Sequence, residues 1–343
     1  MQFIRHHPMS RNDLRQCLRI ATGGTLGFLI SKMMGFNYAV FFTVTPMLLL
    51  GLVPVISVAV TRQVFASSVL SIIEVGLLAG LFGGQPIVMT LIAFILFLYR
   101  FACMSKGSLF LFGANGVISL SIMLHFASYP DTNVNDLIFC NFWGHISSIC
   151  IAFLMMAVFP DVTSRAARTG ESKAPHRMRH EALLGATVAT ISFCAFQVFD
   201  LRDSLSAQAT TLILLFPMHW NGALGYARRR AIGTIIGVSC GLLIQLLLYN
   251  WSHELLLLLP LFWLFTLLFS QAHITEAMGS GVGFAGLTTF GILYGQNLTP
   301  NNDLIFSGLY RTSSILVAIV ATLIACYLVH RILNRFEATR FGH

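Results

Sequence analysis

The sequence predicts an all-α polytopic membrane protein with about twelve transmembrane helices, arranged as two parallel six-helix repeats. The prediction depends on the apolar composition, on apolar runs of membrane-spanning length, and on where the basic residues fall. Of 343 residues, 56% are hydrophobic and 10% are charged, and the mean hydropathy is +0.77. Because soluble domains carry about 25% charged residues, most of this chain cannot face water.

The apolar runs are about 20 residues long, the length that a helix needs to cross a hydrocarbon core of roughly 30 Å. The runs LIAFILFLY (91–99) and LLLLLPLFWLFTLLF (255–269) are apolar on every face. This pattern favours helices over the alternating strands of a β-barrel. The expected spans are 15–35, 38–58, 64–84, 86–104, 107–128, 136–159, 181–199, 204–222, 229–249, 254–270, 277–295 and 303–333.

Residues 160–180 form the only long polar stretch, a basic linker too short to be a domain. It divides the chain into a first six-helix repeat (1–159) and a second one with a short cytoplasmic tail (181–343). The basic N-terminal stretch lacks the small-residue cleavage site of a signal peptide, so we expect a retained first helix.

Charge gives an independent test of this map, because Lys and Arg are retained on the cytoplasmic side of inner-membrane proteins. If the N-terminus is cytoplasmic, the cytoplasmic segments hold 18 of the 21 basic residues, including Arg19, Arg100 and Arg228–Arg230. We interpret Arg228–Arg230 as a lipid anchor. The +8 net charge is therefore a topology signal rather than the footprint of a nucleic-acid partner, and both termini are expected in the cytoplasm.

The two halves also resemble each other in sequence. NDLIF occurs at 135–139 and again at 302–306, and TPMLLLG (45–51) matches FPMHWNG (216–222). Arg62 precedes Gly76, Gly80 and Gly84 as Arg228–Arg230 precede Gly233, Gly237 and Gly241. Since each half has an even number of spans, the repeats run in the same direction.

The stretch from Pro217 through Gly222 to ARRRAIGTIIGV (227–238) resembles the fusaric acid resistance family, which includes bacterial aromatic carboxylic acid exporters. The family pattern Arg-x-x-Gly-Thr-x-x-Gly is filled by Arg230, Gly233, Thr234 and Gly237. The chain looks like the short relatives that lack large cytoplasmic domains. The resemblance implies export of organic acids, with a periplasmic membrane-fusion adaptor and an outer-membrane channel as candidate partners.

The motifs of common enzymes are absent. The chain contains no GxxxxGK[ST], HExxH or GxSxG, so we expect neither an enzyme nor a bound cofactor or metal. Seven cysteines without a CxxC pair are expected to be apolar filler. GVGFAG (281–286) fits a dinucleotide motif but lies within an expected span. Its small residues, like the glycines of the third and ninth spans, are interpreted as sites of close helix approach.

Glu74 and His145 are the candidates for proton coupling. Glu74 lies about ten residues into its span, where a carboxylate costs on the order of 3 kcal/mol unless it is protonated, paired or hydrated. It either couples protons or pairs with a basic or hydroxyl partner. His145 lies at mid-depth in the sixth span and titrates near neutral pH. The alternative is a buried histidine satisfied by a neighbour.

Arg311, beside Tyr310, lies about two turns into the last span. It could hold a carboxylate through paired hydrogen bonds, or it could snorkel or pair with Asp303. Asn115 is expected to form a hydrogen bond across helices. Pro46 and Pro217 remove backbone donors, and each marks either a simple kink or a helix break that lines a cavity. His219, Trp220 and Asn221 place polar and aromatic groups beside the second of them.

These observations predict a bacterial inner-membrane transporter that binds lipid and a small molecule, with homo-oligomers as a further candidate assembly. Proton-coupled outward movement of small aromatic or amphipathic organic acids is the expected activity, in which direction and substrate class come from the resemblance. The alternatives are a transporter of an unrelated substrate, including an importer, and a membrane scaffold or assembly subunit without a translocation path.

Overall fold

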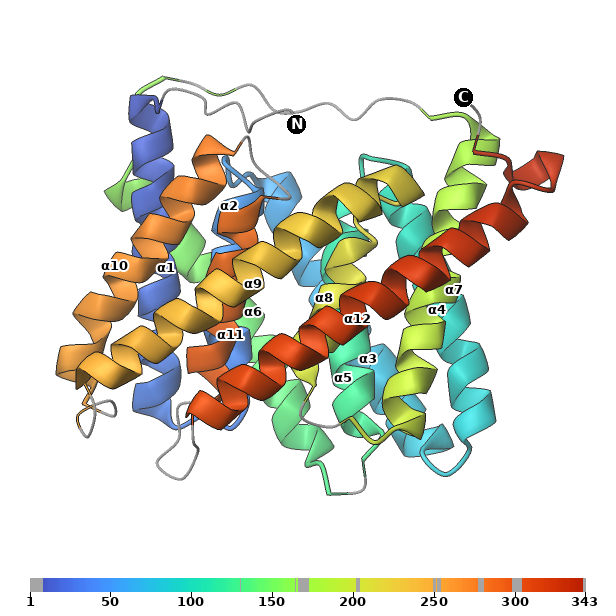
Figure 1. The fold of residues 1–343 in the computed structure, drawn as a ribbon, viewed down its shortest axis with the longest axis horizontal. Helices are drawn as coiled ribbons and strands as arrows, with labels where there is room; N and C mark the ends of the chain where they lie inside the picture. The colour runs from blue at the N-terminus through green and yellow to red at the C-terminus, as the bar shows by residue number, and fades with distance from the viewer. Residues whose placement is uncertain are drawn as a thin grey trace. The chain divides into compact units, whose positions relative to one another are not determined.

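The computed structural model describes residues 9–129, 131–163, 165, 173–201, 204–248, 251, 254–276, 281–297 and 304–341. Within these residues the chain forms twelve α-helices and a short 3-10 turn (Figure 1). Eight of the helices are long and apolar enough to cross a membrane. The chain is therefore a multi-pass membrane protein in which helices account for all the described regular structure.

The helices divide into two compact units, and neither unit is one half of the sequence. The first contains residues up to Ser57, Trp143–Ala167 and Arg228–Ser313; the second contains Val58–Phe142, Arg168–Ala227 and residues from Ser314. Each unit takes helices from both the N-terminal and the C-terminal half. The boundaries of the sequence repeats, 1–159 and 181–343, are thus a different division and stay a prediction.

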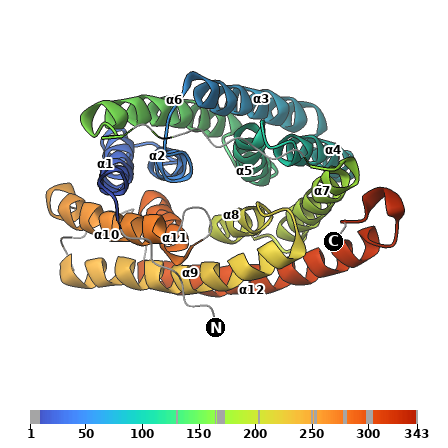
Figure 2. The same ribbon diagram turned by 90° about the horizontal axis from the view of Figure 1, so that it is seen from above.

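In the first unit, α1 packs against both α2 and α10, and α2 packs against α11 (Figure 2). Its helices are α1 (Arg11–Met34), α2 (Val40–Leu52), α10 (Leu255–Thr275) and α11 (Val282–Asn297), joined by parts of α6 (Val134–Val158), α9 (Trp220–Leu248) and α12 (Leu304–Leu333). An aromatic cluster fills the interior: the Phe28 and Phe262 rings stack with centroids 4.6 Å apart, and Phe290 stacks on Phe262 at 5.0 Å.

In the second unit, α7 packs against α4 and α8, and α5 packs against α3, α4 and α8. Its complete helices are α3 (Val58–Phe82), α4 (Pro86–Ser105), α5 (Phe110–Ala127), α7 (Pro175–Val198) and α8 (Leu205–Leu214), and the 3-10 turn η2 (Glu337–Thr339) follows α12. Every residue of the short helix α8 is buried. The ring of Phe101 on α4 lies where a β-carbon on Gly185 of α7 would be, so a glycine allows these two helices to meet.

Glycines also explain how α2 becomes a buried helix. On α1, a β-carbon at Gly24 would lie 2.6 Å from the Met47 side chain, and one at Gly27 would collide with the Phe42 carbonyl. On α11, one at Gly291 would lie 2.8 Å from the same Met47 sulfur. Ten of the 13 residues of α2 are consequently buried.

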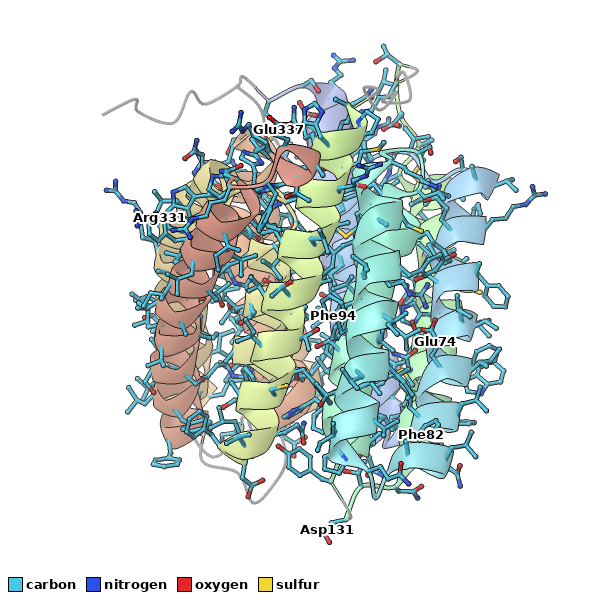
Figure 3. All side chains as sticks on the ribbon, turned by 90° about the vertical axis from the view of Figure 1, so that its right-hand side faces the viewer. Glu74, Phe82, Phe94, Asp131, Arg331 and Glu337 are labelled. Atoms are coloured by element: carbon cyan, nitrogen blue, oxygen red, sulfur yellow. The ribbon has the colours of Figure 1, made fainter. Side chains whose placement is uncertain are left out.

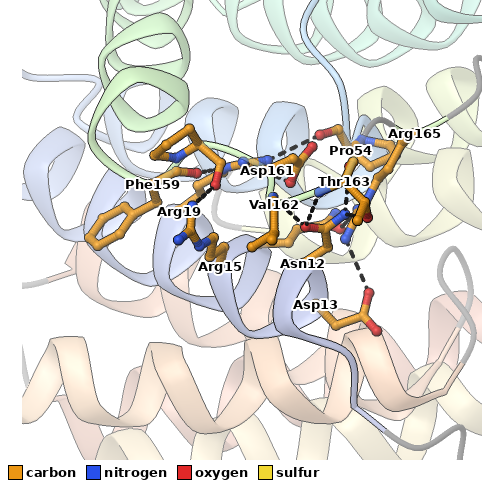
Figure 4. A network of polar contacts seen from close by, with 12 residues as sticks. Asn12, Asp13, Arg15, Arg19, Pro54, Phe159, Asp161, Val162, Thr163 and Arg165 are labelled. Atoms are coloured by element: carbon orange, nitrogen blue, oxygen red, sulfur yellow. Dashed lines mark hydrogen bonds and ion pairs between the residues drawn. The ribbon is translucent and has the colours of Figure 1, made fainter.

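A polar network fastens the start of α1 to the segment that follows α6 (Figure 4). The buried Arg19 side chain donates from Nε to the Phe159 carbonyl at 2.7 Å and from NH2 to Asp161 at 2.8 Å. Its NH1 donates to the Pro54 carbonyl at 3.3 Å. Asn12 accepts from the Val162 amide at 2.7 Å. Arg19 is therefore a buried residue that joins α1 to the segments after α2 and α6.

Candidate functional site

The central feature of the second unit is a buried ion pair between α3 and α4. Arg100 NH2 lies 2.7 Å from Glu74 Oε2, and the two side chains are 0% and 11% exposed. The same NH2 lies 3.4 Å from the Ser71 hydroxyl. Figure 3 shows Glu74 on the side of α3 that faces α4. The structure therefore shows the basic partner that one of the two interpretations of Glu74 required.

Arg100 reaches this position because α5 leaves room for it. A β-carbon on Gly116 would lie 2.9 Å from Arg100 Cδ and 3.0 Å from its Nε. The guanidinium also lies 4.8 Å from the centroid of the Phe112 ring, a cation–π distance. Any larger residue than glycine at position 116 would push the arginine away from Glu74.

The guanidinium is only partly satisfied. Of its three nitrogens, Nε and NH1 are buried and have no hydrogen-bond partner in the described structure. An arginine has five N–H donors, and a buried charge is expensive unless its donors are used. The structure thus holds a buried cation with two nitrogens that make no hydrogen bond among the described residues.

Small polar side chains continue along α3 from this pair. The Ser67 hydroxyl donates to the Phe112 carbonyl at 2.7 Å, and Ser68 lies 3.4 Å from Asn141. Asn115 on α5 donates to the Val64 carbonyl at 3.4 Å, which confirms the predicted hydrogen bond across helices. Polar contacts therefore join α3 to its neighbours over much of its length.

The motif Arg230, Gly233, Thr234 and Gly237 forms one face of α9 in the first unit, and that face packs on α11. Arg230 is 0% exposed and donates from NH1 to the Thr288 hydroxyl. A β-carbon on Gly233 would lie 2.5 Å from Ala285, and one on Gly237 would lie 2.8 Å from the Gly286 carbonyl. Close helix approach is thus confirmed for α9 and for GVGFAG.

Two interpretations from sequence were wrong here. Arg230 is buried between helices rather than anchored in lipid, because α9 already begins at Trp220 and places this residue in its third turn. The glycines of the third span do not mediate close approach, since a β-carbon on Gly80 or Gly84 would meet nothing within 4 Å. Gly76 would meet only Ile138, at 3.7 Å.

The remaining candidates in the first unit lie on α6 and α12. His145 on α6 is 2% exposed, and Arg311 on α12 is 4% exposed. Tyr310, its neighbour, is 37% exposed and so points away from the buried side. The Asp303 carboxylate proposed as a partner of Arg311 lies outside the described residues, as does the start of the second NDLIF copy.

The two prolines have different effects. Helix α2 runs through Pro46 without ending, so the helix break predicted there is absent. Helix α8 ends at Leu214, and Pro217 lies in the connection to α9. The next residue, Met218, has a left-handed backbone with φ of 57°, which strains a side chain of its size. The break at Pro217 is therefore real.

Beside this break, His219 is half-buried and its Nδ1 lies 2.6 Å from the Pro217 carbonyl. Trp220 packs on Tyr327 of α12 with centroids 5.4 Å apart, whereas Asn221 is exposed. In the second unit, the structure thus places Glu74 and Asn115 on α3 and α5, and His219, Trp220 and Asn221 at the α8–α9 break.

Arg100 is the main residue that sequence reasoning missed as part of a site. It stands at the end of a long apolar run and was counted among the cytoplasmic basic residues. Arg100 already lay within the expected span 86–104, and the structure shows that its side chain is fully buried there. The spacing gave a hint of this, because Arg100 lies more than one helical turn before the end of the span at Ser105.

Comparison with known proteins gives one match. No curated protein and no solved structure matches the chain. Residues 16–155, which run from α1 into α6, match the family model described as a protein of unknown function (DUF2955).

Proposed function

We propose that this protein is an inner-membrane transporter that moves small aromatic or amphipathic organic acids outward in a proton-coupled reaction, as a member of the fusaric acid resistance group. The Glu74–Arg100 pair carries the transport and proton-coupling parts of this proposal, whereas the outward direction and the substrate class come from the resemblance to that group. Ionisable residues inside membrane spans are expensive and are found mainly where ions or substrates pass. This pair lies in two candidate spans and keeps unused donors on its cation.

The pair suggests how a proton and an organic acid could be linked. A proton on Glu74 removes the negative charge that balances Arg100. The guanidinium, with Nε and NH1 already unused, then favours another anion, and a planar carboxylate matches its forked donors. Arg100 therefore joins Arg311 as a candidate for carboxylate binding, while Glu74 and His145 remain the candidates for proton binding.

The proposed architecture is twelve crossings in two parallel six-helix repeats, with both termini in the cytoplasm. Its support is the internal packing of each unit. Helix α1 packs on α2 and α10, and α7, six helices later, packs on α8 and α4. Likewise α2 packs on α11 as α8 packs on α5. A six-helix shift along the chain thus relates the two sets of contacts.

A proteoliposome experiment tests transport. Purified protein is reconstituted with an internal pH dye, and radiolabelled benzoate is supplied on either side under an imposed pH gradient. We expect benzoate-dependent proton flux from the unaltered chain and its loss from Glu74→Gln, which retains hydrogen bonding without titrating. Glu254→Gln, at an exposed carboxylate before α10, is the matched control.

Arg100→Lys refines the test, because it keeps the charge and loses the planar fork. Benzoate affinity should fall while proton binding to Glu74 survives. If Glu74→Gln transports benzoate at the unaltered rate under the same gradient, the carboxylate is structural. If the unaltered chain moves no benzoate in either direction, the proposed substrate class is wrong, and a transporter of an unrelated substrate or a scaffold replaces it.

One observation favours import as a second candidate function. When Glu74 is protonated, the carboxylate of a substrate would take its place beside Arg100. The proton and the organic acid would therefore be bound to the pair at the same time. They would then cross in the same direction, and an inward proton gradient would drive uptake. In the same vesicles, uptake predicts that protons and benzoate move in the same direction, and export in exchange for protons predicts opposite directions. For export, a periplasmic adaptor remains the proposed partner.

A further inference from the structure

The segment after α12 folds back onto the second unit. It comprises residues 334–341, which we call the C-terminal segment, and its turn η2 packs against α7 (Figure 3). At its end, the Phe341 ring stacks on His219 with centroids 5.6 Å apart and planes 23° apart. The Arg177 guanidinium of α7 lies 4.9 Å from the same ring. Phe341 thus bridges the start of α7 and the α8–α9 break.

A chain of hydrogen bonds through two histidines holds this segment. His180 Nδ1 lies 2.7 Å from the Thr339 carbonyl, and His180 Nε2 lies 3.0 Å from His330 Nδ1. His330 Nε2 lies 2.9 Å from the Asn334 side-chain amide. The Phe341 amide donates to Asn334 Oδ1 at 2.9 Å. The chain therefore links α7, the end of α12 and the end of the segment.

These partners determine where the protons are. A carbonyl only accepts, so His180 Nδ1 must carry a hydrogen. Asn334 uses its oxygen for the Phe341 amide and its NH2 group for His330 Nε2, which must accept. The hydrogen of His330 is then on Nδ1 and is donated to His180 Nε2. Each donor meets an acceptor only when both imidazoles are neutral.

An added proton breaks this arrangement wherever it binds. On His180 it would set two N–H groups against each other across the 3.0 Å contact. On His330 it would face the NH2 group of Asn334. Flipping the side-chain amide of Asn334 would give His330 an acceptor, but the Asn334 NH2 group would then face the backbone N–H of Phe341. In both cases the clash is relieved by separating the C-terminal segment from its partners.

The charged neighbours offset such a proton only in part. Glu181, next to His180, is already bound by Lys173 at 2.7 Å and by Arg177 at 3.1 Å. His219 is the other titratable group that faces His330.

We propose that the C-terminal segment is a proton-released latch. It stays closed on the α8–α9 break while His180 and His330 are neutral and opens as the pH falls below the ordinary histidine range, about 6.5. The break that it covers includes the strained Met218 backbone, so the latch holds the α8–α9 connection in one conformation. This regulation does not depend on whether the protein transports an organic acid.

Amide hydrogen exchange tests the latch in the purified full chain in lipid nanodiscs. The exchange of the Phe341 amide is measured at pH 7.5 and pH 5.5 and corrected for the intrinsic chemical rate. We expect protection to fall by at least about tenfold at the lower pH, since one released donor-acceptor contact of about 1.4 kcal/mol corresponds to that factor. Unchanged protection in the unaltered chain would overturn the proposal.

Variants assign the effect to the two histidines. The double variant His180→Asn with His330→Asn cannot titrate at these positions, so its Phe341 protection should be equal at both pH values. His125→Asn, at another buried histidine of the second unit, should keep the full pH dependence. A pH dependence that persists in the double variant would show that other groups control the segment.

Asn334→Asp tests whether the pH of release shifts in the expected direction. Its carboxylate can accept from a protonated His330 with one oxygen and from the Phe341 amide with the other. The latch should therefore stay closed to a lower pH than in the unaltered chain. Release at a higher pH would contradict the proposed hydrogen-bond chain.

Discussion

Gly27 of α1 lies directly against the main-chain oxygen of Phe42 on α2, where any β-carbon would collide with it. Phe42 stands four residues before Pro46, which has no N–H to donate to that carbonyl. The Gly27 backbone thus covers a carbonyl that cannot receive the usual hydrogen bond from the residue four positions later. A weak Cα–H···O contact is the interaction available there.

Gly27→Ala should therefore destabilise the protein, by about 1–3 kcal/mol as for other overpacked interior sites. Thermal unfolding in detergent measures the effect. Gly80→Ala is the control, because a β-carbon there meets nothing within 4 Å and alanine favours helices by up to about 1 kcal/mol. Equal loss of stability in both variants would mean that the contact with Phe42 is unimportant.

Removing one member of the buried ion pair should be more damaging than removing both. Arg100→Leu leaves the Glu74 carboxylate without its cation, at a cost of about 3–5 kcal/mol. The double variant Glu74→Leu with Arg100→Leu should be more stable than the single one. Chemical unfolding of the four proteins of this cycle measures the coupling. Additive losses would show that the two charges do not interact.

Arg19→Lys should weaken the hydrogen bonds that hold α1 against residues 159–163. The arginine bonds three different groups with three nitrogens, and an ammonium cannot reach all of them. We expect a loss of about 1–3 kcal/mol and faster exchange of the Val162 amide. Arg15→Lys, which alters a single exposed contact with the Pro160 carbonyl, should change neither quantity appreciably.

The proposed topology predicts where reporters fused to the chain will be found. A reporter inserted in the linker 160–180 should be cytoplasmic, and one inserted at 297–302 should be periplasmic, because basic residues are retained inside. Alkaline phosphatase is active only in the periplasm and green fluorescent protein mainly in the cytoplasm, so paired fusions give opposite signals. Phosphatase activity at the linker would reverse the orientation.

The positions of the helices could be predicted from sequence because apolar length is a local property. All twelve expected spans coincide with a helix, and the largest shifts lie around α8 and α9. Within the expected span 204–222, helix α8 ends at Leu214, because Pro217 and the left-handed backbone of Met218 interrupt the helix. Helix α9 begins at Trp220, which moves Arg230 from a helix end into the interior.

The partners of buried charges could not be predicted in the same way. Arg100 meets Glu74 26 residues away, and Arg19 meets Asp161 142 residues away. Counting basic residues on the cytoplasmic side does not separate the buried Arg19, Arg100 and Arg230 from exposed ones, because hydropathy contains no information about which helices are neighbours. The histidine chain from His180 to Asn334 is equally non-local and leaves no motif in the sequence.

The composition of the two compact units has a consequence for biosynthesis. Helices α1 and α2 leave the ribosome early, but α10 and α11, which pack against them in the first unit, follow more than 200 residues later. At about 5–20 residues per second, the early helices wait on the order of ten seconds or more for their partners. During that interval the faces of α1 and α2 that contact α10 and α11 lack their partners, so Phe28 on α1 waits for Phe262 and Met47 on α2 waits for Gly291.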